Sequence, residues 1–120
     1  MARPGDDLKI RTKNLALEII RLVQAIPRSL TADVIGRQAL RSATSVGANY
    51  RAACRSQSRA AFIAKMSIVI EECDETQYWL ELMNDLKLVD SERFRRLHDE
   101  ADQLVAIFVA SKLTARSQKK

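Results

Sequence analysis

The chain has 120 residues, of which 47% are hydrophobic and 29% are charged, and its formal net charge is +5. This balance describes one globular domain with enough apolar side chains for a core, and it excludes an intrinsically disordered chain. Three Gly and two Pro leave few helix breakers, so we expect long helices. No apolar run approaches the ~20 residues of a membrane span, and residues 1–7 lack the apolar segment of a secretion signal.

The positive charge is concentrated in the first half of the chain. Residues 1–60 contain eleven Lys or Arg and four Asp or Glu (+7), whereas residues 61–120 contain nine and eleven (−2). This asymmetry suits a polyanionic partner or pairing between copies of the chain, and a solvated surface is the simpler alternative. Cys54 and Cys73 lie among apolar helical positions, which indicates a cytoplasmic protein with reduced thiols.

The first apolar stripe predicts a helix over about residues 6–26. Asp6 and Asp7 suit the positive end of the helix dipole, and Pro27 ends the helix. The core positions of this helix follow the helical period. They are Leu8, Leu15, Ile19, Leu22 and Ile26.

A second helix is predicted over about residues 32–55, with Thr31 as its N-cap. One side of this helix carries small apolar residues, and the other side carries arginines within an arc of roughly 80°. The candidate phosphate-binding residues on that arc are Arg37, Arg41, Arg51 and Arg55. Gly47 flanks the apolar side, and close approach of another helix is expected to offset its cost of about 1 kcal/mol relative to Ala.

A polar stripe of Ser42, Ser45 and Asn49 lies beside the core side of this second helix. Asn is a weak helix former, and a buried Asn49 requires a hydrogen-bond partner, such as a group on a neighbouring helix or subunit. Asn49 is therefore a candidate for fixing the register of a bundle.

A third helix is predicted over about residues 58–86, with Ser58 as its N-cap. It carries a core stripe and, on nearly the opposite side, a second apolar stripe. The members of the second stripe are Ile68, Trp79, Leu82 and Leu86. A helix that is apolar on two sides needs two surfaces to pack against, so the second stripe is a candidate interface between copies. The alternative is contact with a flanking helix of the same bundle.

An acidic run, Glu71, Glu72, Asp74 and Glu75, follows the first half of this third helix. The four carboxylates spread around most of the helix and cannot converge on one cation. Two interpretations stay open. Either the run is solvated, or Glu71 or Glu75 pairs with arginines of the second helix, within the bundle or across a subunit boundary.

A fourth helix is predicted over about residues 91–114, opened by Asp90 or Ser91. The links between the four helices are short, so neighbouring helices must run antiparallel. The sequence therefore predicts an all-α, up-down-up-down four-helix bundle that comprises residues 1–120 as a single domain.

The candidate chemistry is limited by a single histidine, His98. A di-iron bundle needs a Glu-x-x-His motif on two helices, and a zinc site would have to draw Cys54, Cys73 and His98 from three helices. No glycine-rich phosphate loop and no nucleophile elbow occurs in the sequence. We therefore expect no enzymatic activity, no metal and no cofactor.

Several motifs in residues 37–86 resemble one known family. They are the run Arg41–Arg51 (RSATSVGANYR), Ser58, FIAK at Phe62–Lys65 and ETxYWLxL at Glu75–Leu82. The family is the group of four-helix bundles encoded in intervening sequences of bacterial 23S ribosomal RNA genes, also labelled S23 ribosomal protein. It is related to the accessory variability determinant of diversity-generating retroelements.

The resemblance implies an antiparallel four-helix bundle that assembles as a ring, typically a homopentamer, with no known catalysis. For the retroelement relatives it implies binding of RNA or DNA and partnership with a reverse transcriptase. Ala52 and Ala61 stand where many relatives have an acidic residue, so no role of those carboxylates transfers to this chain.

Together these observations predict a cytoplasmic, ring-forming oligomer whose arginines contact phosphates from several subunits, without base stacking. The alternative is a protein-interaction scaffold without a nucleic-acid role. In that scaffold the arginines pair with Glu71, Glu72 and Glu75 of neighbouring subunits.

Overall fold

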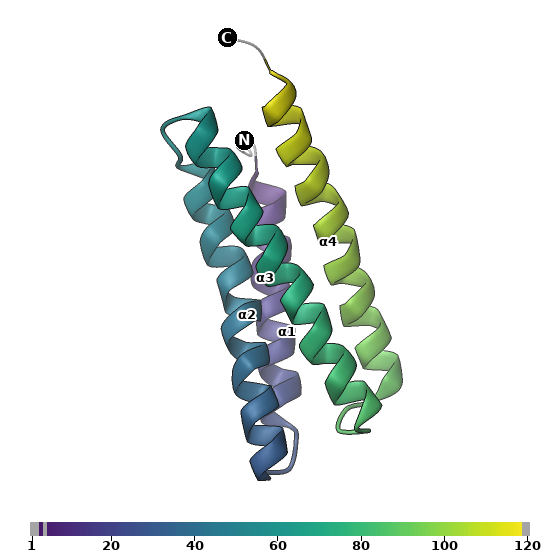
Figure 1. The fold of residues 1–120 in the computed structure, drawn as a ribbon. Coiled ribbons are helices and arrows are strands. Elements are labelled where there is room, and N and C mark those ends of the chain that lie inside the picture. Colours follow the sequence, from purple (N-terminus) through teal and green to yellow (C-terminus); the bar gives the residue numbers. More distant parts are fainter. Residues whose placement is uncertain (1–2, 4, 119–120) are drawn as a thin grey trace.

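The computed structural model describes residues 3 and 5–118, which contain four antiparallel helices joined by short links. They are α1 (Asp6–Gln24), α2 (Leu30–Cys54), α3 (Arg59–Asp85) and α4 (Ser91–Ser117). The helices alternate in direction along a flat molecule of 52 × 28 × 19 Å (Figure 1). The all-α, up-down-up-down bundle predicted from the sequence is confirmed.

Local capping chemistry sets the ends of the helices. Ser58 is the N-cap of α3, as predicted, and of the two candidates for α4 the N-cap is Asp90; each side chain accepts a backbone N–H hydrogen bond. The prediction of Thr31 as the cap of α2 is wrong. Ser29 has the extended backbone of an N-cap and accepts the N–H of Ala32, so Thr31 lies inside the first turn.

Two predicted boundaries also differ from the structure. Helix α1 ends at Gln24 rather than Ile26, since a residue that precedes proline disfavours the helical conformation. Helix α4 continues to Ser117 rather than fading near residue 114, and Ala115 in this added turn is buried.

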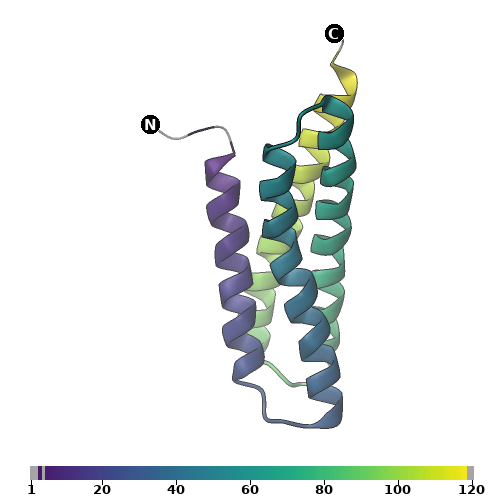
Figure 2. The same ribbon diagram turned by 90° about the vertical axis from the view of Figure 1, so that its left-hand side faces the viewer.

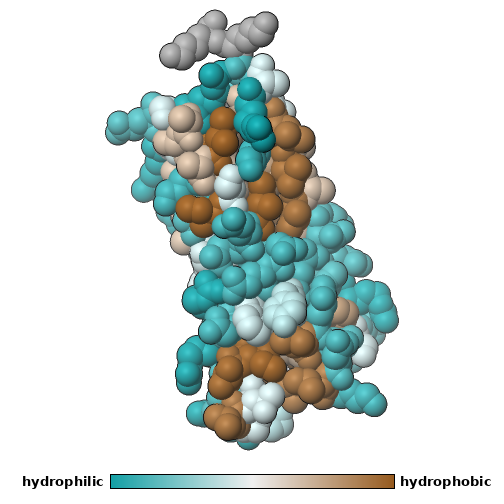
Figure 3. Space-filling view, viewed as in Figure 1, coloured by the Kyte–Doolittle hydropathy of each residue, from teal (hydrophilic) through white to brown (hydrophobic). Residues whose placement is uncertain are grey.

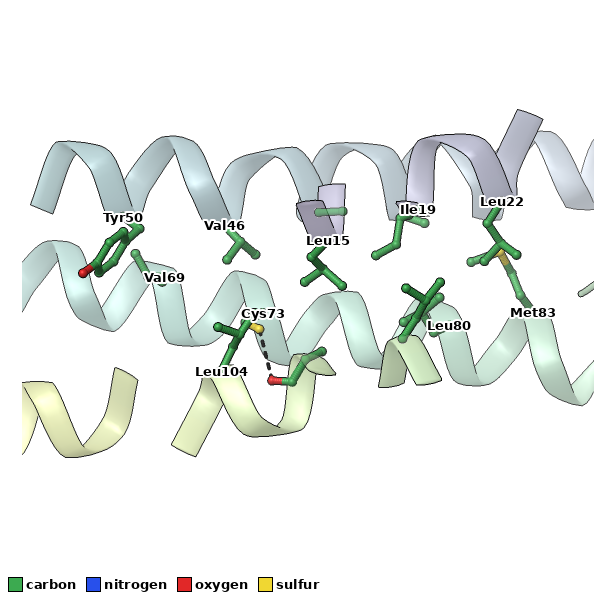
Figure 4. Close-up of a cluster of buried hydrophobic side chains, with 14 of the residues drawn as sticks. Leu15, Ile19, Leu22, Val46, Tyr50, Val69, Cys73, Leu80, Met83 and Leu104 are labelled. Carbon is green, nitrogen blue, oxygen red and sulfur yellow. Dashed lines mark hydrogen bonds between the residues drawn. The ribbon is translucent and has the colours of Figure 1, made fainter. Parts of the chain in front are cut away.

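The core is formed by the apolar stripes of all four helices, part of which Figure 4 shows. Most of the predicted core positions are buried, and Leu8 packs against the core from its edge. Cys73 lies in this core as a free thiol, and burial raises its pKa to about 12. The protonated thiol donates to the backbone carbonyl of Ala101 at 3.5 Å, which is a weak contact between α3 and α4.

Helices α1 and α2 approach each other closely at two glycines of α2. A Cβ atom on Gly36 would lie 2.9 Å from Cγ1 of Val23, and one on Gly47 would lie 3.2 Å from Oγ1 of Thr12. The two glycines are eleven positions apart, which is close to three helical turns, so both face α1. The expected close approach of a helix at Gly47 is therefore observed, with α1 as the partner.

A buried hydroxyl pair links α2 to α3. The side-chain oxygens of Ser42 and Thr76 lie 3.0 Å apart, and both residues are fully buried. Asn49, predicted to fix the register, instead donates to the carbonyl and hydroxyl oxygens of Ser45 within α2. The buried polar link between these two helices is therefore the Ser42–Thr76 pair, and not Asn49.

Helix α4 packs extensively on α3 but only sparingly on α1. A polar groove of about 370 Å³ separates α1 from α4, with Asn14 on one side and Gln103 on the other. Two ion pairs bridge the two helices along this groove. They are Arg11–Glu100 and Glu18–Arg96, each with a shortest N···O distance of 2.7 Å.

The glycine contact predicts a position-specific effect on stability. Gly47→Leu drives a side chain into Thr12 and lowers the free energy of unfolding by about 1–3 kcal/mol, although leucine is the better helix former. Ala48→Leu, at the adjacent exposed position, changes it by no more than about 0.5 kcal/mol. Denaturant unfolding of both variants tests this, and equal effects would contradict a requirement for close approach.

Candidate nucleic-acid interface

The four arginines predicted to bind phosphates differ in their surroundings. All four are exposed, but Arg41 forms ion pairs with Glu72, at 3.1 Å, and with Glu75 on α3. Two carboxylates of the same protomer therefore neutralise Arg41. The assignment of Arg41 to a nucleic-acid site stays a prediction, and in this structure its guanidinium is engaged within the bundle.

Glu75 is the centre of a small polar cluster between α2 and α3. Besides Arg41, its carboxylate accepts the indole N–H of Trp79 at 3.0 Å. The hydrogen bond from Trp79 and the one from Arg41 hold the pKa of Glu75 below its ordinary value. Of the two interpretations of the acidic run, pairing within the bundle applies to Glu75. Glu71 is exposed and forms no ion pair among the described residues.

Arg51 lies instead on a groove between α1 and α2, the two helices that run side by side in Figure 2. The groove has a volume of about 440 Å³, and Lys9 and Lys13 of α1 also line it. We call it the α1–α2 groove. Its floor consists of small residues whose side chains do not fill the space outside the close contact at Gly47. They are Ala16, Thr44, Gly47 and Ala48.

The α1–α2 groove is positively charged at its edge and apolar at its floor. Lys13 and Arg51 form no ion pair with any described residue, whereas Lys9 pairs with a carboxylate oxygen of Asp6 at 3.8 Å. Ile10, which stands beside the two lysines, is 60% exposed. An occupant that satisfies both parts of this groove carries negative charge together with an apolar surface.

The remaining two arginines of the predicted stripe lie away from this groove. Arg37 is fourteen positions before Arg51 on α2, about 21 Å along the helix, and lines a separate depression near Arg28. Arg55 is the C-cap of α2 and is exposed at the end of that helix. Sequence reasoning missed Lys9 and Lys13, although their spacing of four residues on a helix placed them on one side of α1.

The predicted interface stripe divides into buried and exposed members. Trp79 and Leu82 are half-buried against the core, as the flanking-helix alternative expected, whereas Ile68 is 37% and Leu86 51% exposed. Two exposed apolar residues of α2, Leu30 and Val34, lie near the end of the molecule that carries Leu86. Arg41 lies level with Glu75, and α2 and α3 are antiparallel (Figure 1). Leu30 is eleven positions before Arg41 and Leu86 is eleven positions after Glu75, so these two leucines also lie level with each other.

We call this surface the end patch. It consists of Leu30, Val34, Trp79, Leu82 and Leu86. Figure 3 shows apolar areas toward both ends of this side of the molecule, with a hydrophilic band between them. Ile68 is eighteen positions before Leu86 on α3, about 27 Å along the helix, and is not part of the end patch.

The described residues offer little else that suggests a binding site. None of their His, Cys, Asp and Glu side chains gather in a group of three or more that is suited to a metal ion. His98 has Nε2 2.8 Å from a carboxylate oxygen of Glu81 on the bundle surface. No helix in this part of the chain combines the length and the apolar character needed to cross a bilayer.

The Glu75 cluster predicts an acid titration that tryptophan fluorescence detects. The pKa of Glu75 lies below its ordinary value of 4.5, so its stabilising contacts are complete above that pH and are lost as the pH falls through the folded-state pKa. We expect the fluorescence of Trp79, the single tryptophan, to change below pH 4.5.

Two variants separate this titration from general acid unfolding. Glu75→Gln removes it, whereas Glu72→Gln keeps it, because Glu72 bonds Arg41 but not Trp79. Circular dichroism shows over which pH range the helices stay folded. A titration that survives in Glu75→Gln within that range would contradict the assignment.

Comparisons with known proteins place the chain in a family. A family model described as 23S rRNA-intervening sequence protein matches residues 7–110. The crystal structure of a protein with unknown function from the S23 ribosomal protein family of Bacteroides thetaiotaomicron VPI-5482 is similar, with a TM-score of 0.81 and 32% identity. The similarity covers 87% of this chain and 96% of that one. A search of curated proteins finds no match. The chain therefore belongs to the 23S rRNA-intervening sequence protein family.

Proposed function

We propose that this protein is a non-catalytic, self-associating bundle that binds the phosphates of RNA or DNA on its α1–α2 side. The observation that carries this proposal is the convergence of Lys9, Lys13 and Arg51 on one groove. Lys13 and Arg51 have no carboxylate partner among the described residues, whereas Lys9 pairs with Asp6 at 3.8 Å.

The arrangement of charge elsewhere supports the same side. Arginines that contact the other helices are engaged by carboxylates, as in the pairs of Arg11 with Glu100 and of Arg96 with Glu18. An engaged guanidinium has little to gain from a phosphate, because binding would require breaking an existing pair. Lys13 and Arg51, the cations of the α1–α2 groove without such a pair, are therefore the preferred phosphate contacts.

The binding mechanism is electrostatic. Each cation that contacts a phosphate releases condensed counterions from the nucleic acid, so the affinity falls steeply with salt. Three cations per protomer give weak binding by themselves. Several copies in one assembly raise the effective concentration of the remaining sites and convert weak contacts into stable association.

The proposed assembly uses the end patch. Leu30 is 83% and Leu86 51% exposed, and a cluster of exposed apolar residues around a tryptophan is typical of a protein interface. A second copy that covers the end patch removes this surface from water. The resemblance implies a ring of five copies, and we include that number in the proposal.

The alternative function is a scaffold without a nucleic-acid role. One observation favours it. Glu71 and Asp74 are exposed on α3 and are opposite in charge to the α1–α2 groove, so a neighbouring copy offers carboxylates to Lys13 and Arg51. The two functions differ in what charge removal does, because the scaffold loses its assembly whereas the nucleic-acid binder loses its ligand.

If the groove cations contact phosphates, removing the charge of one of them weakens RNA binding. Arg51→Gln reduces the affinity for a labelled RNA. It also makes the fall of log affinity with log salt less steep by about one, because one phosphate contact is lost. Fluorescence anisotropy over a series of salt concentrations measures both quantities, and Lys13→Gln is expected to behave in the same way.

Arg41→Gln is the matched control, since it removes the same charge from the same helix at a paired position. It leaves the affinity and the salt slope close to those of the wild type. Equal losses in Arg41→Gln and Arg51→Gln would show that only the net charge matters. A change in assembly mass in Arg51→Gln, with RNA binding retained, would support the scaffold instead.

The end patch predicts that self-association depends on exposed leucines. We expect the double variant Leu30→Ser, Leu86→Ser to be monomeric at micromolar concentration, where the wild type forms an assembly of about five copies. Light scattering gives the mass of each. Leu113→Ser, a 55% exposed position on α4, is the control and stays assembled. A monomeric wild type would refute the proposed assembly.

A further inference from the structure

We propose that the α1–α2 groove binds single-stranded nucleic acid by seating a nucleobase on its apolar floor while its cations hold the adjoining phosphates. This inference rests on the proposed nucleic-acid binding and names the form of the ligand. The sequence predicted phosphate contacts without base stacking, whereas the structure adds an apolar surface between the cations.

The apolar floor is the first argument. Ala16, Gly47 and Ala48 present methyl groups and backbone, and Ile10 forms an exposed wall beside them. A phosphate chain alone would leave this surface in water, whereas a base covers it and gains the free energy of apolar burial. The floor carries no aromatic side chain, so the contact is aliphatic and tolerates different bases.

The size of the groove is the second argument. Its lining residues lie within two turns of α1 and two turns of α2, about 10 Å of each helix. The volume of about 440 Å³ is in the range of small-ligand sites, which suits one nucleotide. A protein helix that docked only along these two turns would bury far less than the ~1,200–2,000 Å² of a stable interface.

The polar groups around the floor are the third argument. Lys13 and Arg51 stand on opposite helices, so phosphates on either side of a seated base have a cation within reach of a long side chain. The hydroxyl of Thr44 donates to the carbonyl of Leu40 at 2.7 Å, and its oxygen remains free to accept an N–H from a base edge. These groups complement a nucleotide at its charged and polar ends.

The groove therefore discriminates between single strands and duplexes. In a duplex the bases are paired and stacked inside, and only phosphates, sugars and base edges reach a protein surface. A single strand turns its bases outward at no cost in pairing. Duplex RNA engages the cations but not the floor, and we expect it to bind more weakly at each groove.

The experiment compares three labelled probes on the full chain at one salt concentration. They are a single-stranded RNA of mixed sequence, a strand of the same length and charge made of abasic nucleotides, and the same RNA annealed to its complement. We expect the single strand to bind about fivefold to tenfold more tightly than the abasic strand, as burial of one base on aliphatic groups allows. The duplex, counted per groove, should behave like the abasic strand.

Two variants assign this difference to the groove. Ile10→Asn removes the apolar wall without changing the charge, and it should abolish the preference for the normal strand over the abasic strand. Leu113→Asn is the matched control, since Leu113 is 55% exposed against 60% for Ile10 and lies on α4. It should keep the preference, whereas Arg51→Gln weakens the binding of both strands alike.

Failure of the base contact and failure of the proposed phosphate binding give different results. If the normal and abasic strands bind equally, the base contact is refuted and the proposed phosphate binding stands. If no probe binds even at low salt, both are refuted. If Ile10→Asn dissociates the assembly, a second copy occupies the groove and the inference is overturned in favour of the scaffold.

Discussion

The close approach of α1 and α2 at Gly36 and Gly47 is the constraint on which the candidate site depends. Both glycines face α1, and a side chain at either would meet Val23 or Thr12 within 3.2 Å. The contact sets the register that brings Lys9 and Lys13 of α1 level with the second half of α2. The small residues beside it leave the space outside the contact open, so the same feature that joins the helices creates the α1–α2 groove.

Carboxylates decide which cations remain available on this molecule. Exposed ion pairs such as Arg41–Glu72 add little stability, about 0–1 kcal/mol each. They also engage Arg11, Arg41 and Arg96, whereas Lys13 and Arg51 at the α1–α2 groove form no ion pair with a described residue.

The groove and the end patch lie at opposite ends of α2. Arg51 is twenty-one positions after Leu30, about 31 Å along the helix, so the end patch itself does not overlap the groove. Self-association through the end patch and nucleic-acid binding in the α1–α2 groove are therefore compatible in one copy of the chain. Membership of the 23S rRNA-intervening sequence protein family is consistent with this picture but assigns no activity, since the similar S23-family protein is itself described as having unknown function.

The sequence by itself determined the helices, two of their four N-caps and most of the core, because apolar period and capping are local properties that neighbouring residues along the chain specify. It placed the N-cap Ser58 and the core positions Leu15 and Ile19 of α1 correctly. Only the tertiary structure decided which charges are free. Whether Arg41 meets a carboxylate or a phosphate, and whether Lys13 lies beside Arg51, depends on the register between helices, and that register is set by contacts between residues far apart in the chain.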